Sequence, residues 1–269
     1  MVPVPLKYLF WTVMEKTNIC SPGKHIFVAC FQKAGSTYLT RAIAEYTGFR
    51  CGMYVHAGLH NEQFINEVKL RIMRHANFVI QQHTKGTERN ILVLKQNNIK
   101  PIVLVRNLFD VIISLRDHHR REDIRHPIGY IHRQYLEMKE EEQLLFITKT
   151  CSPWYFSFLI SWVEASAEID TLWVTYEELI TNPVGTISRI LDYQGLSFET
   201  QKIKDTIVSI SGEKTRLNKG ISGRGKSLPL SAKQALIDIA DCWKIDDNIL
   251  ARIGLDKESR EETLLCKGS

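Results

Sequence analysis

Short apolar runs alternate with longer amphipathic stretches along most of this 269-residue chain. Four runs rich in β-branched residues predict buried strands, and they lie at residues 25–31, 77–83, 101–107 and 170–177. Strands that are buried on both faces and separated by helices are typical of βαβ units. We therefore expect an α/β fold: a single domain with a central, mostly parallel sheet of about five strands flanked by helices.

Three helices are predicted from apolar residues that recur at helical spacing. The first follows Gly35, the second covers about residues 154–168, and the third begins at Ser231, where Gln234 would complete a capping box. The apolar stripes comprise Leu39, Ile43 and Tyr46; Trp154, Phe158 and Trp162; and Leu236, Ile239, Ala240 and Trp243. Residues 117–150 are charged and histidine-rich, so we expect surface helix and loop there.

Composition and charge narrow the range of partners. Hydrophobic residues make up 44 % and charged residues 24 % of the chain, which is ordinary for a globular protein. The net charge of +5 is too small for a dedicated nucleic-acid binder. A locally positive cleft would still concentrate a small polyanion. We therefore expect a small anionic ligand and no nucleic-acid partner.

The ends of the chain and its cysteines bear on its compartment. Residues 1–14 predict a helix packed on the core, with a membrane-surface contact as the alternative, because they are apolar but too short to span a bilayer. They also lack the marks of a signal peptide. The six cysteines include no Cys-x-x-Cys pair, which favours a reducing compartment. We expect a cytoplasmic protein without a transmembrane segment, with a helical lead-in at 1–24, a core at 25–255 and a tail at 256–269.

Four histidines raise the question of a metal site. They are His118, His119, His126 and His132. They lie in a charged stretch without zinc-like spacing. We expect a solvated or acceptor-facing surface there and no metal.

The segment FVACFQKAGSTYLTRAI (27–43) indicates an anion site. A buried strand ends near Phe31, and a helix begins at once after a short loop that holds Lys33, Gly35, Ser36 and Thr37. Small residues let the backbone approach an anion closely, and the N–H groups of the first helical turn point at it. The alternative is a plain strand–turn–helix connection with a serine cap.

The order of residues in this loop argues against a nucleotide triphosphatase. That class needs Gly-x-x-x-x-Gly-Lys-Ser/Thr, whereas here Lys33 precedes Gly35. The later strand ends in Arg106, where a Walker B strand would end in a magnesium-binding aspartate. A cation at that strand end indicates direct anion binding without a metal.

A second anion site is predicted where the strand at 101–106 ends. Arg106 closes the strand, Asn107 can cap the next helix, and Ser114 lies about two turns into it. Because parallel sheets bind ligands at the carboxyl ends of their strands, Arg106 should lie beside the first loop. An arginine fork and a hydroxyl suit a phosphate monoester. The alternative is a structural ion pair between Arg106 and Asp110.

Four segments, in this order, resemble motifs of the sulfotransferase family that depends on 3′-phosphoadenosine 5′-phosphosulfate (PAPS). FQKAGSTYL resembles the family's 5′-phosphosulfate loop, and VLVRNLFDVIIS resembles its 3′-phosphate motif. VTYEELITNP (174–183) and NKGISGRG (218–225) resemble two later motifs. The resemblance implies the family's P-loop-like fold. It also implies an enzyme that moves a sulfuryl group from PAPS to a hydroxyl or amine of an acceptor.

The resemblance also implies a role for each matching residue. Lys33 would contact the leaving phosphate and the sulfuryl group during catalysis. The remaining cofactor-binding positions are Ala34, Gly35, Ser36 and Thr37 at the 5′-phosphosulfate, Tyr38 and Tyr176 near the adenine, and Arg106, Ser114, Lys219 and Gly220 at the 3′-phosphate. The sulfuryl group carries less charge than a phosphoryl group, so no metal is expected.

His83 is the candidate general base. It ends the predicted strand at 77–83 and precedes Arg106 at close to the spacing of cytosolic members of the family. A neutral imidazole there can take the acceptor proton as the oxygen attacks sulfur. The alternative is a solvent-exposed histidine at a strand end.

Two positions depart from the family pattern. Gln81 stands where cytosolic members often carry a lysine, and Lys85 is the candidate replacement. Asn218 stands where an arginine is usual, with Arg216 and Arg224 nearby. These substitutions leave the exact donors of each site open.

The acceptor is not set by these motifs. Residues 51–66 and 117–155 are the expected walls of its pocket, with Tyr54, Phe64, Tyr130, Trp154 and Tyr155 as candidate lining. We expect a small-molecule, carbohydrate or lipid acceptor, and a homo-oligomer is possible. The alternative from another class is a non-catalytic module of the same fold that binds adenosine bisphosphates. A metal-free kinase is disfavoured by Arg106 and the missing Walker pattern.

Overall fold

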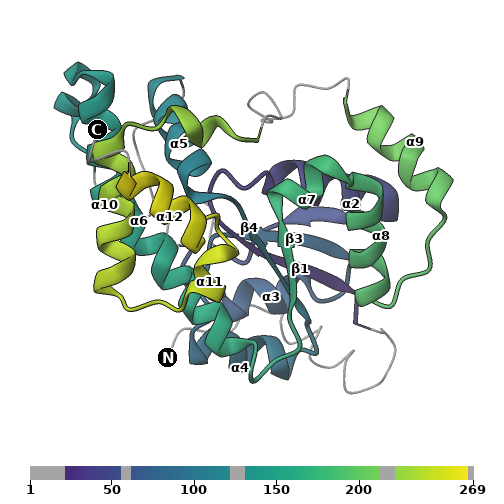
Figure 1. The fold of residues 1–269 in the computed structure, drawn as a ribbon. Coiled ribbons are helices and arrows are strands. Elements are labelled where there is room, and N and C mark those ends of the chain that lie inside the picture. The colour runs from purple at the N-terminus through teal and green to yellow at the C-terminus, as the bar shows by residue number, and fades with distance from the viewer. Residues whose placement is uncertain (1–21, 56–61, 122–130, 212–221, 266–269) are drawn as a thin grey trace.

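The strands form one sheet in the order β2-β3-β1-β4-β5 (Figure 1). The computed structural model describes residues 22–55, 62–121, 131–211 and 222–265. The strands are β1 (His25–Cys30), β2 (Arg50–Gly52), β3 (Phe78–Gln82), β4 (Pro101–Val105) and β5 (Leu172–Thr175). Each pairing within this sheet is parallel. The predicted α/β fold with a parallel sheet is therefore confirmed.

Helices separate the successive strands and follow β5. They are α2 (Ser36–Thr47), α3 (Glu67–Met73), α4 (Glu88–Gln96), α5 (Leu108–Arg121), α6 (Glu140–Ala165), α7 (Tyr176–Thr181), α8 (Pro183–Tyr193), α9 (Thr200–Ser211), α10 (Leu230–Cys242), α11 (Asp247–Ala251) and α12 (Lys257–Leu265). Two short 3-10 helices, η1 (Arg133–Glu137) and η2 (Arg224–Ser227), complete the elements described.

The helices divide into two groups around the sheet. Helices α2, α8 and α9 pack together on one side, and α5, α6 and α10 pack together on the other (Figure 1). Right-handed crossovers explain this division, because the chain leaves β1 toward one edge of the sheet and leaves β3 and β4 toward the other. The carboxyl end of β1 is therefore a topological switch point, where sheets of this kind bind ligands.

The four predicted apolar runs contain β1, β3, β4 and β5. Every residue of β1 and β4 is buried, which explains why their runs are uninterrupted. The strand that periodicity could not locate is β2. It has three residues, and the first two are exposed, so no apolar run marks it.

The second predicted helix begins much earlier than residue 154. Helix α6 starts at Glu140 and runs through Pro153. The glutamates at 140–142 form its first turn, where carboxylates are favourable near the positive end of the helix dipole. The interpretation of residues 117–150 as surface was also partly wrong, because His119, Tyr135 and Gln143 are buried.

The third predicted helix is confirmed, but its capping box is wrong. Helix α10 begins at Leu230, and the amide of Gln234 donates to the Asp238 carboxylate one turn along instead of reaching back. Trp243 is 41 % exposed, because α10 ends at Cys242 and Trp243 no longer continues the buried face of the helix. Within the described part of the chain, no helix is long and apolar enough to cross a membrane.

Candidate active site

The loop between β1 and α2 has the geometry of an anion site. Gly35 is the N-cap residue of α2, in the left-handed region at φ +79°, and no side-chain hydrogen bond caps the first turn. The first N–H groups of a helix have no partner within it, so an uncapped first turn leaves them for a ligand. The predicted alternative of a serine cap is therefore wrong.

The side chains of this loop differ in exposure. Thr37 is exposed at the surface, and Lys33, Gly35 and Tyr38 are half-buried. Ala34 and Ser36 are buried beneath them. The backbone of Lys33 is also left-handed, at φ +66°, which is uncommon for a residue with a side chain. The loop is thus held in an irregular conformation close to the surface.

The absence of a side chain at Gly35 is required by Tyr176. A Cβ atom at Gly35 would lie 2.8 Å from Cδ2 of the Tyr176 ring. Tyr176 is the first residue of α7 and is buried. The ring therefore packs directly on the loop, which joins two of the predicted motifs.

Arg106, from the segment that resembles the 3′-phosphate motif, lies at the same place. Its guanidinium lies over the Tyr176 ring, with Cζ 3.9 Å from the ring centroid, and its Nη1 donates to the carbonyl oxygen of Lys33 at 3.0 Å. Its Nη2 lies 3.4 Å from Oδ2 of Asp110, so the predicted structural ion pair forms as well. Arg106 is 5 % exposed. The structure therefore places Arg106 beside the first loop, as predicted.

Asp110 connects this group to the late segment of the chain. Its carboxylate accepts hydrogen bonds from the backbone N–H groups of Gly223, at 2.9 Å, and Gly225, at 2.5 Å. Arg224 between them donates to Asp117 at 2.6 Å. Lys219 and Gly220, predicted at the 3′-phosphate, lie outside the described residues, as do Arg216 and Asn218. The sequence singled out Asp110 only as the alternative partner of Arg106.

Ser114, like Ser36, Arg106 and Tyr176, is a predicted site residue that is buried. It lies within α5 and is 2 % exposed. Asn107 at the start of that helix accepts the N–H of Asp110 at 3.3 Å, as expected for a capping side chain.

His83 follows β3 directly and faces the end of β1. Its Nδ1 lies 2.9 Å from the carbonyl oxygen of Cys30 and 3.4 Å from the Cys30 thiol. Burial lowers the pKa of His83, but the thiol and carbonyl of Cys30 and the carboxylate of Glu62 outweigh it and raise the pKa to about 9. The alternative prediction of a solvent-exposed histidine is therefore wrong, since His83 is half-buried and its ring contacts Cys30.

Helix α6 brings aromatic side chains to the same end of the sheet. The rings of Tyr155 and Phe158 pack edge-on against Phe31, at centroid distances of 4.9 and 5.1 Å. The Trp154 indole donates to Oε1 of Gln63 at 3.0 Å, and the amide of Gln63 donates to the carbonyl of His83. Two predicted acceptor walls, residues 51–66 and 117–155, therefore meet next to His83.

Other candidate lining residues lie elsewhere. Tyr54 is fully buried and hydrogen-bonds with His25 at the opposite end of β1, so its proposed place in an acceptor pocket is wrong. Phe64 is 57 % exposed. Tyr130 and His126 lie outside the described residues.

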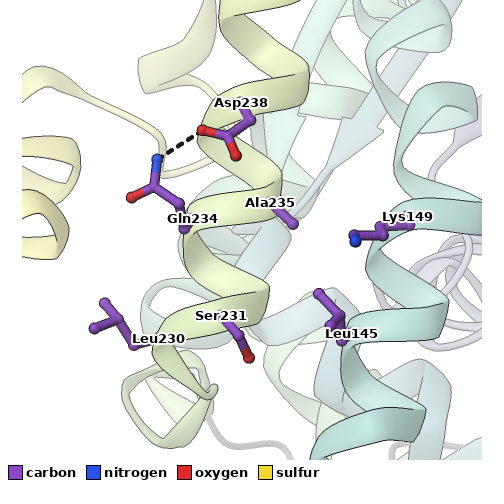
Figure 2. A pocket seen from close by; sticks show the side chains of 7 residues that line it. All are labelled: Leu145, Lys149, Leu230, Ser231, Gln234, Ala235 and Asp238. Atoms are coloured by element: carbon purple, nitrogen blue, oxygen red, sulfur yellow. Dashed lines mark hydrogen bonds between the residues drawn. The ribbon is translucent and has the colours of Figure 1, made fainter. Parts of the chain in front are cut away.

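A separate hollow opens between α6 and α10 (Figure 2). It measures about 380 Å³ and is lined by Leu145, Lys149, Leu230, Ser231, Gln234, Ala235 and Asp238. Leu145 and Lys149 fall within the predicted acceptor wall at 117–155, but none of the seven residues was singled out as a ligand contact, and the hollow is not a candidate for the anion site. Among the described residues, no group of three or more histidines, cysteines or carboxylates lies close enough to hold a metal ion.

Comparison with known proteins gives a family. The sulfotransferase domain family matches residues 23–221. A search of curated protein sequences found no match.

Solved structures share the fold at low identity. Mouse sulfotransferase SULT7A1 complexed with PAP superposes with a TM-score of 0.62 and 14 % identity, over 87 % of this chain and 89 % of that one. Retinol dehydratase with androsterone and the inactive cofactor PAP gives 0.58 and 16 %, over 86 % and 83 %. Retinol dehydratase with retinol and PAP gives 0.57 and 15 %, over 86 % and 84 %.

Proposed function

The chain belongs to the sulfotransferase domain family, and from that premise we propose that this transferase moves a sulfuryl group from PAPS to a hydroxyl or amine of an acceptor. The observation that carries the proposal is the meeting of the uncapped α2 loop, Tyr176 and Arg106 at the switch point of the sheet. The similar solved structures that contain PAP support it.

The residues present fit such a nucleotide. The first-turn N–H groups of α2, at Ser36 and Thr37, would hold the 5′-phosphosulfate beside Lys33 and Ala34. Arg106 would hold the 3′-phosphate and share its guanidinium between the ligand and Asp110. Ser114, Lys219 and Gly220 would complete that subsite, and Tyr38 and Tyr176 would flank the adenine.

The chemistry follows from these assignments. PAPS supplies an activated sulfuryl group. Nε2 of His83 would accept the acceptor proton as the acceptor oxygen bonds to sulfur. Lys33 and the N–H groups of the loop would stabilise the negative charge that develops on the leaving oxygen.

Calorimetric titration of PAP tests the cofactor site. We expect micromolar binding to the wild type, and binding at least about tenfold weaker in Arg106→Lys, which keeps the charge but loses the planar fork. Arg252→Lys is the matched control, because Arg252 also lies over an aromatic ring, that of Trp173, away from the loop. ATP with magnesium should not bind. If PAP does not bind to the folded wild type, the proposed function is rejected.

Binding alone leaves the non-catalytic module as the alternative. Two of the similar structures are of a protein named retinol dehydratase, so sharing this fold does not fix the reaction. Transfer of radiolabelled sulfate from PAPS to a panel of phenols, alcohols and amines separates the two functions. Binding without transfer in any arm would favour the module.

The acceptor and the compartment are part of the proposal. We propose a small-molecule, carbohydrate or lipid acceptor that approaches His83 from the side of Gln63, which is half-buried and holds the Trp154 indole, because Tyr155 behind them is fully buried. We propose a cytoplasmic setting, which the free thiols of Cys30, Cys51, Cys151 and Cys242 support.

A further inference from the structure

The ends of β1 and β3 place a cysteine against the candidate base. The two strands are neighbours, and Ala29 of β1 pairs with Gln82 of β3. The next residue on each strand is Cys30 and His83. Cys30 also immediately precedes the anion loop. Its side chain is therefore fixed between the two sites that the reaction would use.

Cys30 holds one edge of the imidazole. The Nδ1–H group of His83 donates to the Cys30 carbonyl oxygen at 2.9 Å, and the thiol sulfur lies 3.4 Å from the same nitrogen. The thiol itself lies 3.7 Å from the carbonyl oxygen of Gln82, to which it can donate. These contacts fix the tautomer that carries its proton on Nδ1. In the neutral imidazole, which prevails above the pKa of about 9, Nε2 then keeps the lone pair.

The backbone of His83 is held from a second direction. Its N–H donates to the Glu62 carboxylate at 2.9 Å, and its carbonyl accepts the amide of Gln63 at 3.0 Å. Trp154 in turn donates to Gln63. Among the residues that the structure describes, none forms a hydrogen bond with Nε2 of His83.

We propose that Cys30 is a positioning residue for His83: its carbonyl and thiol hold Nδ1, so that Nε2 faces the acceptor as the proton-accepting nitrogen. This rests on the proposed function. Cys30 is fully buried, so its thiol cannot touch a substrate and acts only through the imidazole. The proton of the acceptor passes to Nε2 as the oxygen–sulfur bond forms, and the electron pair of the broken sulfur–oxygen bond stays on the leaving phosphate.

The groups around the imidazole come from three elements. Cys30 on β1 and Glu62 on the segment before α3 act on the imidazole itself, whereas Tyr155 on α6 acts on Cys30. Burial raises the pKa of Tyr155 well above its usual value, so it stays neutral and adds no charge. Cys30 and Glu62 both favour the protonated imidazole and thus make His83 a stronger base.

The pKa of His83, measured by NMR from its ring proton signals, tests this role without any assay of activity. The signal is identified by its loss in His83→Gln. In Cys30→Ala, which keeps the carbonyl but removes the thiol, we expect the pKa of His83 to fall by about one unit. Cys151→Ala is the matched control, because Cys151 is also a fully buried thiol but has no hydrogen bond with His83.

Cys30→Val fills a similar volume without a polar group and takes the place of Cys30→Ala if that variant does not fold. An unchanged His83 pKa in a folded Cys30 variant would overturn the proposal. In the transfer assay, the alkaline rise of kcat/KM should move to lower pH in the same Cys30 variant and stay in place in Cys151→Ala. A shifted NMR pKa in a protein that does not bind PAP would keep Cys30 as the partner of His83 and reject the proposed function instead.

Discussion

The backbone conformations of Lys33 and Gly35 set the shape of the anion loop. Both lie in the left-handed region, at φ +66° and +79°. Glycine adopts this region at no steric cost, whereas a residue with a Cβ atom pays about 1 kcal/mol or more. The backbone of Lys33 is therefore strained at the position where we propose that its charge acts. Such strain persists only where neighbours hold it, and here Arg106 holds the Lys33 carbonyl.

Replacing Gly35 tests how tightly Tyr176 closes on this loop. We expect Gly35→Ala to lower the free energy of unfolding by about 2 kcal/mol or more, because the left-handed backbone and the ring of Tyr176 both oppose a Cβ atom. Gly48→Ala, at the other end of α2, is the matched control: its φ is +72°, but nothing lies within 4 Å of an added Cβ. Urea denaturation of both variants measures the difference. Equal losses of unfolding free energy in the two variants would show that the Tyr176 ring moves aside without cost.

Asp110 determines how η2 is attached to α5. Asp110 is 1 % exposed, and its carboxylate accepts the backbone N–H groups of Gly223, just before η2, and of Gly225 within η2, in addition to the contact with Arg106. A buried carboxylate with three donors is satisfied, and each donor is positioned by it. The late segment and the Arg106 site therefore depend on one side chain.

Asp110→Asn should loosen η2 selectively. We expect a loss of about 3 kcal/mol in stability, because Arg106 would remain buried without its carboxylate. Hydrogen exchange at the amides of Gly223 and Gly225 should become faster. Asp117→Asn is the comparison, since Asp117 binds the Arg224 side chain but neither of these amides. If both variants expose the amides equally, the attachment through Asp110 is not specific.

Periodicity located the elements that carry the site, but not the contacts that tune it. Lys33, His83 and Arg106 could be placed because each lies directly after, or close after, a predicted strand. The contacts of Glu62 and Cys30 with His83 could not, because these partners are distant in sequence and Glu62 lies in a segment without a regular pattern. The start of α6 was missed because a run of glutamates is equally typical of a solvated loop and of a helix N-terminus.

The two ends of the sheet contain histidines with opposite titration behaviour. At the amino end of β1, His25 accepts the Tyr54 hydroxyl at Nδ1 and donates from Nε2 to the carbonyls of Met73 and Ala76. Burial lowers the pKa of His25, although these carbonyls oppose it. At the carboxyl end, the pKa of His83 is raised. One end of the molecule thus favours a neutral imidazole and the other a charged one.

This contrast predicts the acid stability of the protein. The unfolded chain protonates His25 near pH 6.5, whereas the folded chain does so only at lower pH, so the contribution of His25 to stability should fall as the pH drops below about 6.5. Denaturant unfolding at pH 7.5 and 5.5 measures the sum of this loss and of an opposing gain from His83, and the loss on acidification should be smaller in His25→Gln than in the wild type. His83→Gln should make the loss larger, because its raised pKa acts with the opposite sign. A loss that is unchanged in His25→Gln would contradict the assignment.

The central position of β1 has a consequence for how the chain folds. Its two partners, β3 and β4, arrive roughly 50 and 75 residues later in the chain, since His25 pairs with Phe78 and Phe27 with Pro101. No pair in the described sheet is a hairpin, because every pairing is parallel. Each pairing must therefore close a long loop before it gains stability. During synthesis, β1 leaves the ribosome before β3 and β4 and has no strand to pair with until they follow. Over that interval its apolar side chains can aggregate or bind chaperones.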